Sequence, residues 1–426
     1  MSRGAVRAGA PGPALAAAFA AALVAVWVAA AFPTGAAAAA APSDSTAPAA
    51  APAAPAADSA AAPPAAPGAA LPRARSTDWE TLATGLPEEA RVGFAQQFRY
   101  NRVDGPALLA GAEVRDERQP RPLVRVVAGY AFSRERGLGE AEANVPLDGD
   151  RRFILGGSIY RRTATEDGWI VGEAENTIFG LVARTDYRDH YESEGYEGRF
   201  VWRPGRDAGI LLGAVVEKQR SLRTRTRVAL FGHDDTFRAN PAIEPGEDGV
   251  VWGAVRVGPE RLPSRGGSRI VIRYERSGDP IEGDFEYGRV HAQANWRQRV
   301  SPGQTARVRA IAASTRSGTL PAQKVWDLGG IGTLRGEPHQ RIHGDQFFLL
   351  NAEFAVRARK NVDAIAFLDW GTAWFGRDAW DEARPLLDGG LGLRVGEGPT
   401  AVTIARNLQR SDAPFVVGVR LGGTWE

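Results

Sequence analysis

Apolar and polar side chains alternate along the chain from about residue 90 to its end. The alternation is clearest after residue 347, where every second position is apolar: Phe348, Leu350, Ala352, Phe354, Val356 and Ala358. The positions between them include Asn351, Glu353, Arg357 and Arg359. Because successive side chains of a β-strand point to opposite faces, this pattern predicts a strand that separates an apolar medium from a polar one.

The same period of two recurs in other segments. It is found at 269–276, 305–312 and 391–395, and in the last segment, where Phe415, Val417, Val419, Leu421 and Trp425 share one face. Counting such segments gives about fifteen or sixteen expected strands after residue 90. No helical periodicity of comparable length is found. The sequence therefore predicts an all-β fold.

Two all-β architectures fit this pattern, a soluble β-sandwich array and a transmembrane antiparallel β-barrel. A soluble sandwich tolerates Lys, Asn, Thr and Glu on its polar face, whereas arginine and glycine dominate that face here. The apolar face continues to the strand ends, as contact with lipid requires. A bilayer admits strands only as closed barrels, because an open edge would leave backbone groups unpaired in hydrocarbon. The pattern favours a transmembrane barrel, with sixteen strands as the expected number.

The connections between the expected C-terminal strands alternate in length. A tight turn at Lys360-Asn361 is followed by a long polar segment at 376–385, a short one at 396–399 and a longer one at 407–413. Bacterial barrels have short periplasmic turns and longer extracellular loops. Counting back from a periplasmic C-terminus, we expect the glycine-rich segment 328–346 on the extracellular side.

Residues 1–77 differ in composition from the rest of the chain. Arg3 and Arg7 precede an apolar run at 14–32 and a series of small residues, which is the arrangement of a secretory signal peptide at 1–40. An uncleaved membrane anchor is the alternative. Residues 41–77 are rich in Pro and Ala and are expected to form a disordered linker. This leaves 78–426 for the barrel.

Net charge and cysteine content exclude several classes of function. The net charge is only +2, so the sequence gives no basis for binding nucleic acid. The chain has no cysteine, which excludes a disulfide framework and thiolate metal sites. The lack of cysteine also suits an oxidising compartment outside the cytoplasm.

A set of short motifs lies between residues 329 and 394. They are Gly329-Gly330, Leu334-Arg335-Gly336, Gly344-Asp345, Asn351-Ala352-Glu353-Phe354, the run 367–374 and the glycine-rich segment 389–394. Together these motifs resemble the BamA/TamA-type outer-membrane assembly superfamily, also called the bacterial surface antigen proteins. The resemblance implies a sixteen-stranded barrel whose sixth extracellular loop folds back into the lumen, with five strands after that loop. Five are expected here, at about 347–359, 362–375, 387–396, 400–407 and 414–426.

The resemblance also implies roles for individual residues. Arg335 would reach into the lumen and pair with Glu353 and Asp369, because a guanidinium presents a planar fork that can hold two carboxylates. This pairing would hold the loop motif of Gly329, Gly330, Leu334, Arg335 and Gly336 against the barrel wall. The apolar face from Phe415 to Trp425 would be the C-terminal strand signal.

Three features depart from the pattern of the superfamily. Glu337 stands where Tyr or Phe is usual, so aromatic packing at the loop tip is expected to be lost or altered. The chain ends Trp425-Glu426, which places the usual terminal aromatic residue one position early. No stretch before the strands has the length and mixed α/β pattern of the periplasmic POTRA modules that usually receive client proteins.

Other motifs give weaker indications of chemistry. The glycines of 328–336 lack the buried parallel strand and the following helix of a phosphate-binding loop. His339 and His343 have i,i+4 spacing but no third metal ligand nearby. The polar and aromatic run 186–191 is interpreted as a strand end at the membrane interface rather than as an acid–base site. We expect no catalytic residues, no metal and no cofactor.

The function implied by the resemblance is assistance with the insertion or translocation of proteins at the bacterial outer membrane. A weak seam between the first and last strands would open, and client strands would pair with the exposed edge. Expected partners are outer-membrane lipid, client outer-membrane proteins and a separate periplasmic POTRA or lipoprotein partner. The alternative is a POTRA-less passive channel or structural barrel without assembly activity. An outer-membrane enzyme is a third and less favoured hypothesis.

Overall fold

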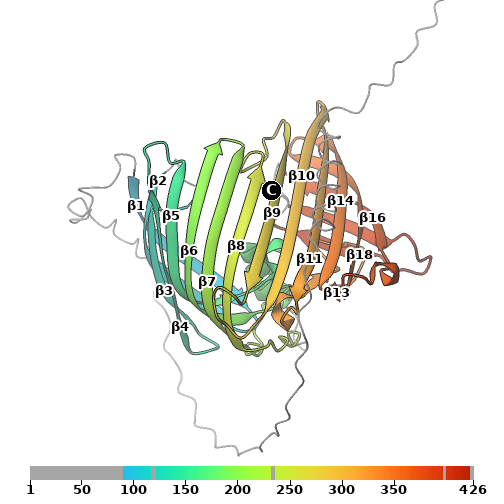
Figure 1. Cartoon of the computed structure of the whole chain (residues 1–426). Helices are drawn as coiled ribbons and strands as arrows, with labels where there is room; N and C mark the ends of the chain where they lie inside the picture. Colours follow the sequence, from blue (N-terminus) through green and yellow to red (C-terminus); the bar gives the residue numbers. More distant parts are fainter. Residues whose placement is uncertain (1–89, 117–120, 232–235, 397–399, 423–426) are drawn as a thin grey trace, which may run out of the picture. The chain divides into compact units, whose positions relative to one another are not determined.

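Sixteen antiparallel strands form one continuous sheet (Figure 1). The computed structural model describes residues 90–116, 121–231, 236–396 and 400–422. The expected signal peptide and linker and the residue Trp425 lie outside the described residues. Every strand pairs with the next one along the chain, without a crossover. The predicted fold class and strand number are confirmed.

The sixteen strands include all the segments for which the sequence pattern gave bounds, although the last strand is shorter than the expected 414–426. They are β1 (Ala90–Asn101), β2 (Gly105–Asp116), β3 (Val124–Ala131), β4 (Arg136–Pro146), β5 (Phe153–Ala164), β6 (Tyr191–Gly205), β7 (Ala208–Ser221), β8 (Gly246–Val257), β9 (Gly266–Ser277), β10 (Tyr287–Ser301), β11 (Gln304–Gly318), β14 (Gln346–Arg359), β15 (Val362–Trp374), β16 (Leu386–Val395), β17 (Ala401–Asn407) and β18 (Val416–Arg420). The five strands expected after the glycine-rich loop are β14 to β18.

The remaining elements lie in the connections between strands. They are a two-stranded sheet of β12 (Trp326–Leu328) and β13 (Ile342–Gly344), the helix α2 (Glu173–Ala183), and the short 3-10 helices η2 (Asp167–Trp169), η3 (Ala322–Lys324) and η4 (Trp380–Glu382). Across the described part of the chain, no helix is both long and apolar enough to cross a membrane. The sequence pattern did not indicate α2.

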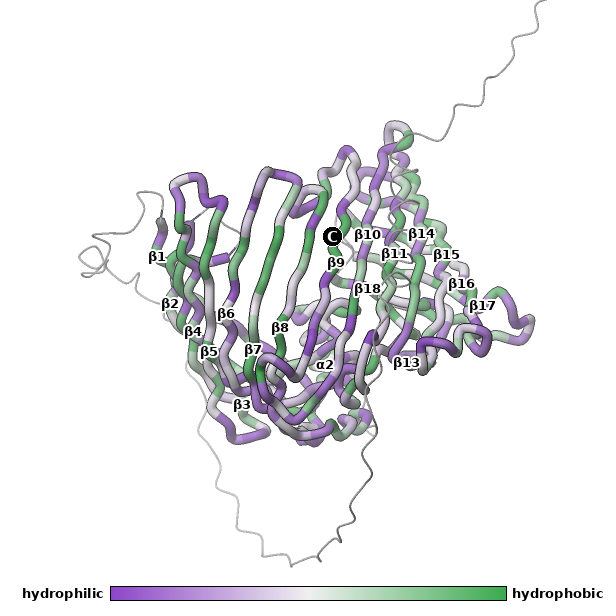
Figure 2. Tube along the Cα trace, viewed as in Figure 1, coloured by the Kyte–Doolittle hydropathy of each residue, from purple (hydrophilic) through white to green (hydrophobic). Residues whose placement is uncertain are grey.

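The two faces of the sheet differ as the alternation predicts. On β14, Phe354 and Val356 are each 40% exposed, whereas Asn351 is 0% and Glu353 is 6% exposed. Hydrophobic residues run along the strands, and hydrophilic residues gather at the turns (Figure 2). Large apolar side chains therefore cover the outer face, which suits lipid, and charged side chains gather on the inner face.

Long and short connections alternate from β5 to the last strand, whereas the connections before β5 are all short. We number the connections on the side of the long ones in chain order, with residues 102–104 as the first, so that loop L3 is residues 165–190, L6 is residues 319–345 and L8 is residues 408–415. The turns between them are short, as at Pro302-Gly303 and Lys360-Asn361. The glycine-rich loop is thus the sixth connection on this side of the sheet, and β13 lies near the lower end of the strands in Figure 1.

The inner side of the sheet has its own apolar core. Residues of L6 pack there against side chains from β8, β10, β11 and β14, and the fully or nearly fully buried members are Tyr287, Ile311, Leu328, Leu334, Phe347 and Leu349. Trp169 of L3 stacks on Phe347 at a centroid distance of 5.5 Å. Loops L3 and L6 are therefore packed inside the curve of the sheet.

The two ends of the sheet are not joined. Strands β1 and β18 are the terminal members of the strand order, and no ladder pairs them within the described residues. Strand β18 has only five residues, against twelve in β1. The fold therefore differs from the closed barrel of the sequence prediction by an open seam between its first and last strands.

Candidate functional site

The tip of loop L6 is a tight, buried turn. Gly329 and Gly330 have φ values of +127° and +81°, a region that L side chains rarely adopt. The backbone N–H of Gly330 donates to the carbonyl oxygen of Leu334 at 2.9 Å. Leu334 itself is fully buried in the core formed with β14. This turn fixes the direction in which Arg335 leaves the loop.

The structure places Arg335 against both acids that the resemblance implied. Its Nε and Nη2 atoms donate to the two carboxylate oxygens of Asp369, each at 2.7 Å. Its Nη1 atom lies 3.3 Å from Oε2 of Glu353, and its backbone N–H also donates to Asp369 at 3.1 Å. The guanidinium carbon lies 3.4 Å from the ring centroid of Phe367. The bidentate bond and the stacking fix the plane of the guanidinium.

Strand register explains why these two acids meet at one arginine. Asp369 of β15 is directly opposite Asn351 of β14, and Glu353 follows Asn351 by two residues on the same face. Asn351 donates to Asp369 Oδ1 and to the carbonyl oxygen of Thr333, both at 2.8 Å. Arg394 of β16 forms an ion pair with the other oxygen of Glu353. Two arginines therefore face two carboxylates in a buried, charge-balanced cluster, which we call the Arg335 anchor.

Gly336 continues the attachment on the next strands. Its backbone N–H donates to Oδ2 of Asp388 on β16 at 2.7 Å. A Cβ atom added at Gly336 would lie 2.5 Å from the carbonyl carbon of Arg406 on β17. Only glycine fits so close to the wall, which gives the Leu-Arg-Gly motif a physical reason.

Glu337 has a role that sequence reasoning missed. The side chain is 1% exposed and accepts hydrogen bonds from Asn407 Nδ2 at 2.8 Å and from Arg410 Nη2 at 3.2 Å. These partners lie at the end of β17 and in L8. Aromatic packing was expected to be lost or altered at this position, and Glu337 makes a charged, hydrogen-bonded contact instead. The unusual acid in the motif was the available signal, but its partners lie some seventy residues away in sequence.

The apolar face of the last strand lies apart from the anchor. Phe415 and Val417 are 64% and 68% exposed, and Val419 and Leu421 are each 37% exposed. These side chains point outward, as a lipid-facing strand requires. They have no place in the L6 cluster.

In the run 186–191 only Tyr191 belongs to a strand, and most of the run is buried, so its interpretation as a strand end at the membrane interface is wrong. Asp186 and His190 are 3% and 5% exposed and lie in L3, before β6 begins at Tyr191. Asp186 Oδ2 accepts a hydrogen bond from the backbone N–H of Arg102 at 2.9 Å and lies 3.0 Å from His190 Nε2. Burial raises the pKa of Asp186, but His190 and Arg102 outweigh it and hold that pKa below its ordinary value.

Other carboxyl groups of L3 are shifted in opposite directions. Burial opposes ionisation of Glu166, but Lys324 and Arg289 lower its pKa to about 2. Asp167 has no such cationic pair, and burial together with Asp189 raises its pKa to about 7. Glu166 is therefore ionised at neutral pH, whereas the adjacent Asp167 gains or loses its proton near pH 7.

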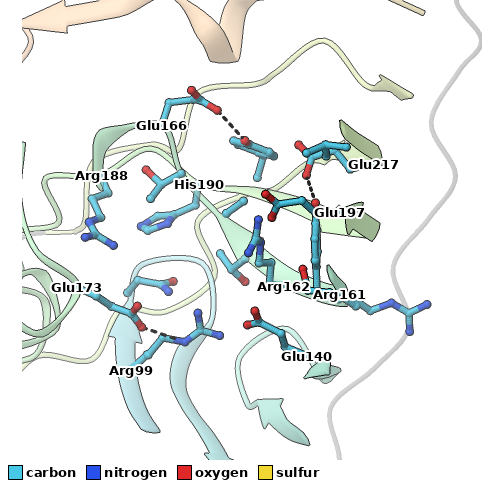
Figure 3. A pocket seen from close by; sticks show the side chains of 18 of the residues that line it. Arg99, Glu140, Arg161, Arg162, Glu166, Glu173, Arg188, His190, Glu197 and Glu217 are labelled. Atoms are coloured by element: carbon cyan, nitrogen blue, oxygen red, sulfur yellow. Dashed lines mark hydrogen bonds and ion pairs between the residues drawn. The ribbon is translucent and has the colours of Figure 1, made fainter. Parts of the chain in front are cut away.

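A polar cavity of about 640 Å³ lies beside L3, inside the sheet (Figure 3). Side chains of both charges line it, among them Arg99, Arg162, Arg188, Glu140, Glu166 and Glu217. No group of three or more His, Asp or Glu residues with metal-binding geometry occurs in the part of the chain that is described. His339, a candidate ligand from its spacing, instead packs edge-on against Tyr187 at 5.4 Å. The cavity is therefore a space inside the sheet lined by side chains of both charges.

Comparison with known proteins supports the fold. No protein-family model and no curated protein sequence matches the chain. Among solved structures, BamA from Haemophilus ducreyi lacking POTRA domains 1–3 is similar with a TM-score of 0.52 and 13% identity, over 78% of this chain and 69% of that one. CdiB from Acinetobacter baumannii and from Escherichia coli match with a TM-score of 0.42 at 14% and 16% identity, over 78% of this chain and 59% and 62% of theirs. The chain therefore has the fold of the BamA barrel.

Proposed function

We propose that this chain is a bacterial outer-membrane protein that assists the insertion or translocation of other proteins. The open seam between β1 and β18 is the observation that carries this proposal. An unpaired strand edge presents a row of backbone donors and acceptors, which is a template for an added strand. An extended client segment with alternating apolar residues would pair there and pass its apolar face to the lipid.

The anchored loop L6 supports this proposal. The Arg335 anchor fastens L6 to β14 and β15, and Glu337 fastens it to the end of β17, one strand from the seam. A loop that holds three of the last strands in place would keep the wall rigid while the seam opens. The proposed partners are lipid, client barrel proteins and a separate periplasmic POTRA or lipoprotein partner.

A passive channel is the second candidate, and the polar cavity favours it. The lumen holds a charged space of about 640 Å³, as a water-filled channel would. However, L3 and L6 pack inside the sheet and fill much of its interior. No catalytic step is proposed for either function.

Reconstitution of the full chain separates the two functions. We would add an unfolded eight-stranded outer-membrane barrel to liposomes with and without the protein and follow client folding by its heat-modifiable gel shift. Assembly activity predicts faster client folding with the protein than with empty liposomes or an unrelated sixteen-stranded porin. Steady single-channel conductance with no gain in folding rate would refute the proposal and favour the channel.

A further inference from the structure

Helix α2 of loop L3 contacts the free edge of β1. Glu173, Thr177 and Gly180 are spaced i, i+4, i+7 and so share one side of the helix. Glu173 Oε1 accepts a hydrogen bond from Gln97 Nε2 at 2.8 Å and lies 3.3 Å from Arg99 Nε (Figure 3). This side of α2 therefore lies against the first strand.

The contact with β1 includes its backbone. The N–H of Tyr100 donates to Thr177 Oγ1 at 3.2 Å. A Cβ atom added at Gly180 would lie 3.3 Å from the ring of Tyr100, so the helix approaches the strand closely. Among the described residues β1 pairs with β2 alone, so its other edge is open to the helix.

The other side of α2 contacts the end of β18. Glu175 follows Glu173 by two residues, about 200° around the helix, and so points the opposite way. Its Oε1 atom accepts the backbone N–H of Leu421 at 2.8 Å and lies 3.0 Å from Nε of Arg420. The Glu175 side chain is 1% exposed. The helix thus spans from one end strand to the other and covers part of the seam.

These contacts are the ones that an added strand would have to replace. In a membrane every backbone donor needs a partner, and at an open edge that partner is normally another strand. Here side chains of α2 take the donors of Tyr100 and Leu421. A client strand that pairs with β1, or with β18 and the residue that directly follows it, would therefore compete with α2 for the same N–H groups.

The attachment of α2 to β18 is incomplete. Oε1 of Glu175 receives all the hydrogen bonds of the carboxylate, while Oε2 is buried without a hydrogen-bond partner among the described residues. A buried carboxylate oxygen without a partner weakens the net contact. An incoming strand would offer several backbone hydrogen bonds in place of one carboxylate.

Loop L6 supports α2 from within. Ile170 and Val171, just before the helix, form a buried apolar cluster with Ile331 of L6. After the helix, Asp186 accepts a hydrogen bond from Asn176 Nδ2 at 2.8 Å. The Arg335 anchor holds L6, and L6 in turn holds the segment that precedes α2.

We propose that α2 is a built-in competitor for the strand-addition site. At rest Glu175 and Thr177 occupy the backbone donors of Leu421 and Tyr100, and a client strand displaces the helix to enter the seam. This regulation rests on the proposed function in protein insertion, because it assigns a resting occupant to the same seam.

A reversible lock at the β18 contact tests the proposal. A Cβ atom at Gly422 would lie 3.8 Å from Cβ of Glu175, within the range of a disulfide. The chain has no cysteine, so the pair Glu175→Cys/Gly422→Cys introduces the only two thiols. When oxidised, the pair should reduce client folding to the rate of empty liposomes. When reduced, it lacks the carboxylate and should fold the client faster than the unaltered chain, by roughly five- to tenfold.

A matched pair in loop 375–385 provides the control. Gly376→Cys/Ala379→Cys has the same Cβ separation of 3.8 Å but lies between β15 and β16, away from the seam. Because Gly376 has a φ of +83°, which strains an L side chain, the oxidised pair is compared with its own reduced form. Its oxidation should leave client folding unchanged. If the unaltered chain accelerates folding and the seam pair behaves alike when oxidised and reduced, α2 is no competitor, although the insertion function stands.

Hydrogen exchange tests the contact without any client. In the unaltered full chain, the amides of Leu421 and Tyr100 should exchange slowly, and Glu175→Gln should speed exchange at Leu421 roughly five- to tenfold. Equal protection of Leu421 in both chains would overturn the proposal even if client folding fails for other reasons. Client folding in liposomes thus tests the insertion function, and hydrogen exchange at Leu421 tests whether α2 occupies the seam.

Discussion

The Arg335 anchor and helix α2 both hold a loop to the inner wall, but they do so at strands of different kinds. Arg335 binds Asp369 and Glu353 on β15 and β14, each of which is paired on both sides within the sheet. Helix α2 binds β1 and β18, each of which has a single partner strand. Strands that are paired on both sides have no free edge for a further strand. Strands β1 and β18 each have a free edge, so an incoming strand can take the place of α2 there. The Arg335 anchor is therefore suited to hold L6 in place, and the α2 contact is suited to dissociate when a client strand binds.

The hydrogen bonding of the two contacts supports the same distinction. Both oxygens of Asp369 accept from Arg335, and Asn351 adds a further bond. Among the described residues, only one oxygen of Glu175 accepts hydrogen bonds. A buried carboxylate that is hydrogen-bonded through both oxygens, as Asp369 is, contributes more to stability than one bonded through a single oxygen. We therefore expect the anchor to be much harder to break than the α2 contact.

The largest effect should come from Arg335→Ala. The substitution leaves the carboxylate of Asp369 buried without its arginine, which costs about 3–5 kcal/mol in comparable buried pairs. The free energy of unfolding in urea, followed by tryptophan fluorescence, should fall by that amount, and L6 should become sensitive to protease. Arg341→Ala is the control, since the Arg341 side chain is 54% exposed and lies 3.7 Å from Glu337. If Arg335→Ala and Arg341→Ala have equal free energies of unfolding, the Arg335 anchor is not the stronger of the two loop contacts.

The resemblance to the BamA/TamA-type superfamily implied the pairing of Arg335 with Glu353 and Asp369. Strand alternation agrees with an inner-face position for Glu353. Alternation alone does not assign Asp369 to the polar face, because the apolar residues Ile365 and Phe367 share its phase. The structure shows all three residues buried on the inner face, where Phe367 stacks under Arg335.

The α2 contact could not be predicted in the same way. The helix has eleven residues and no strong apolar stripe, and its only sequence signals are Gly172 before it and Glu173 and Glu175 in its first turn. Its partner Leu421 lies 246 residues from Glu175. A single sequence does not show which residues so far apart in the chain are in contact. The partners of a polar helix inside the lumen depend on how the whole sheet folds around it. The same reason hid the contact of Glu337 with Asn407.

The second effect concerns pH and the region where L3 meets L6. Asp167 faces Asp189 and Asp327, and burial and these charges raise its pKa to about 7 from an ordinary 3.8. Between these values the folded chain holds a proton that the unfolded chain has lost. The contribution of Asp167 to stability should therefore be most favourable below about pH 4 and should decline as pH rises to about 7. From pH 5 to 7 the loss is at most about 2–3 kcal/mol, at 1.36 kcal/mol per unit.

The variant Asp167→Asn isolates this contribution from other titrating groups. Burial lowers the pKa of His339 to about 4, which raises stability across pH 4 to 6.5 and partly masks Asp167 in the unaltered chain. The difference in unfolding free energy between Asp167→Asn and the unaltered chain should therefore grow from pH 5 to 7. If this difference is constant across that range, L3 and L6 are not coupled through a titrating acid.

A smaller effect is expected from Glu337→Gln. The change keeps the shape of the side chain but removes the charge that pairs with Arg410 and Arg341. Because the partly exposed arginines stay solvated, the free energy of unfolding should fall by about 1–2 kcal/mol. Protease cleavage in L8 should rise with it, whereas cleavage in L3 should not. Increased cleavage in L3 would mean that the anchor and α2 are not separable.

The smallest effect, and the sharpest test of the comparison, is expected from Thr177→Val. Valine keeps the shape of threonine but cannot accept a hydrogen bond, so the N–H of Tyr100 loses its bond to α2. One neutral hydrogen bond contributes about 1 kcal/mol, so hydrogen exchange at Tyr100 should rise roughly fivefold. Exchange at Leu421 should hardly change, because Glu175 still holds it. Because α2 touches both edges as one rigid helix, a parallel rise at both amides would show that its two contacts release together.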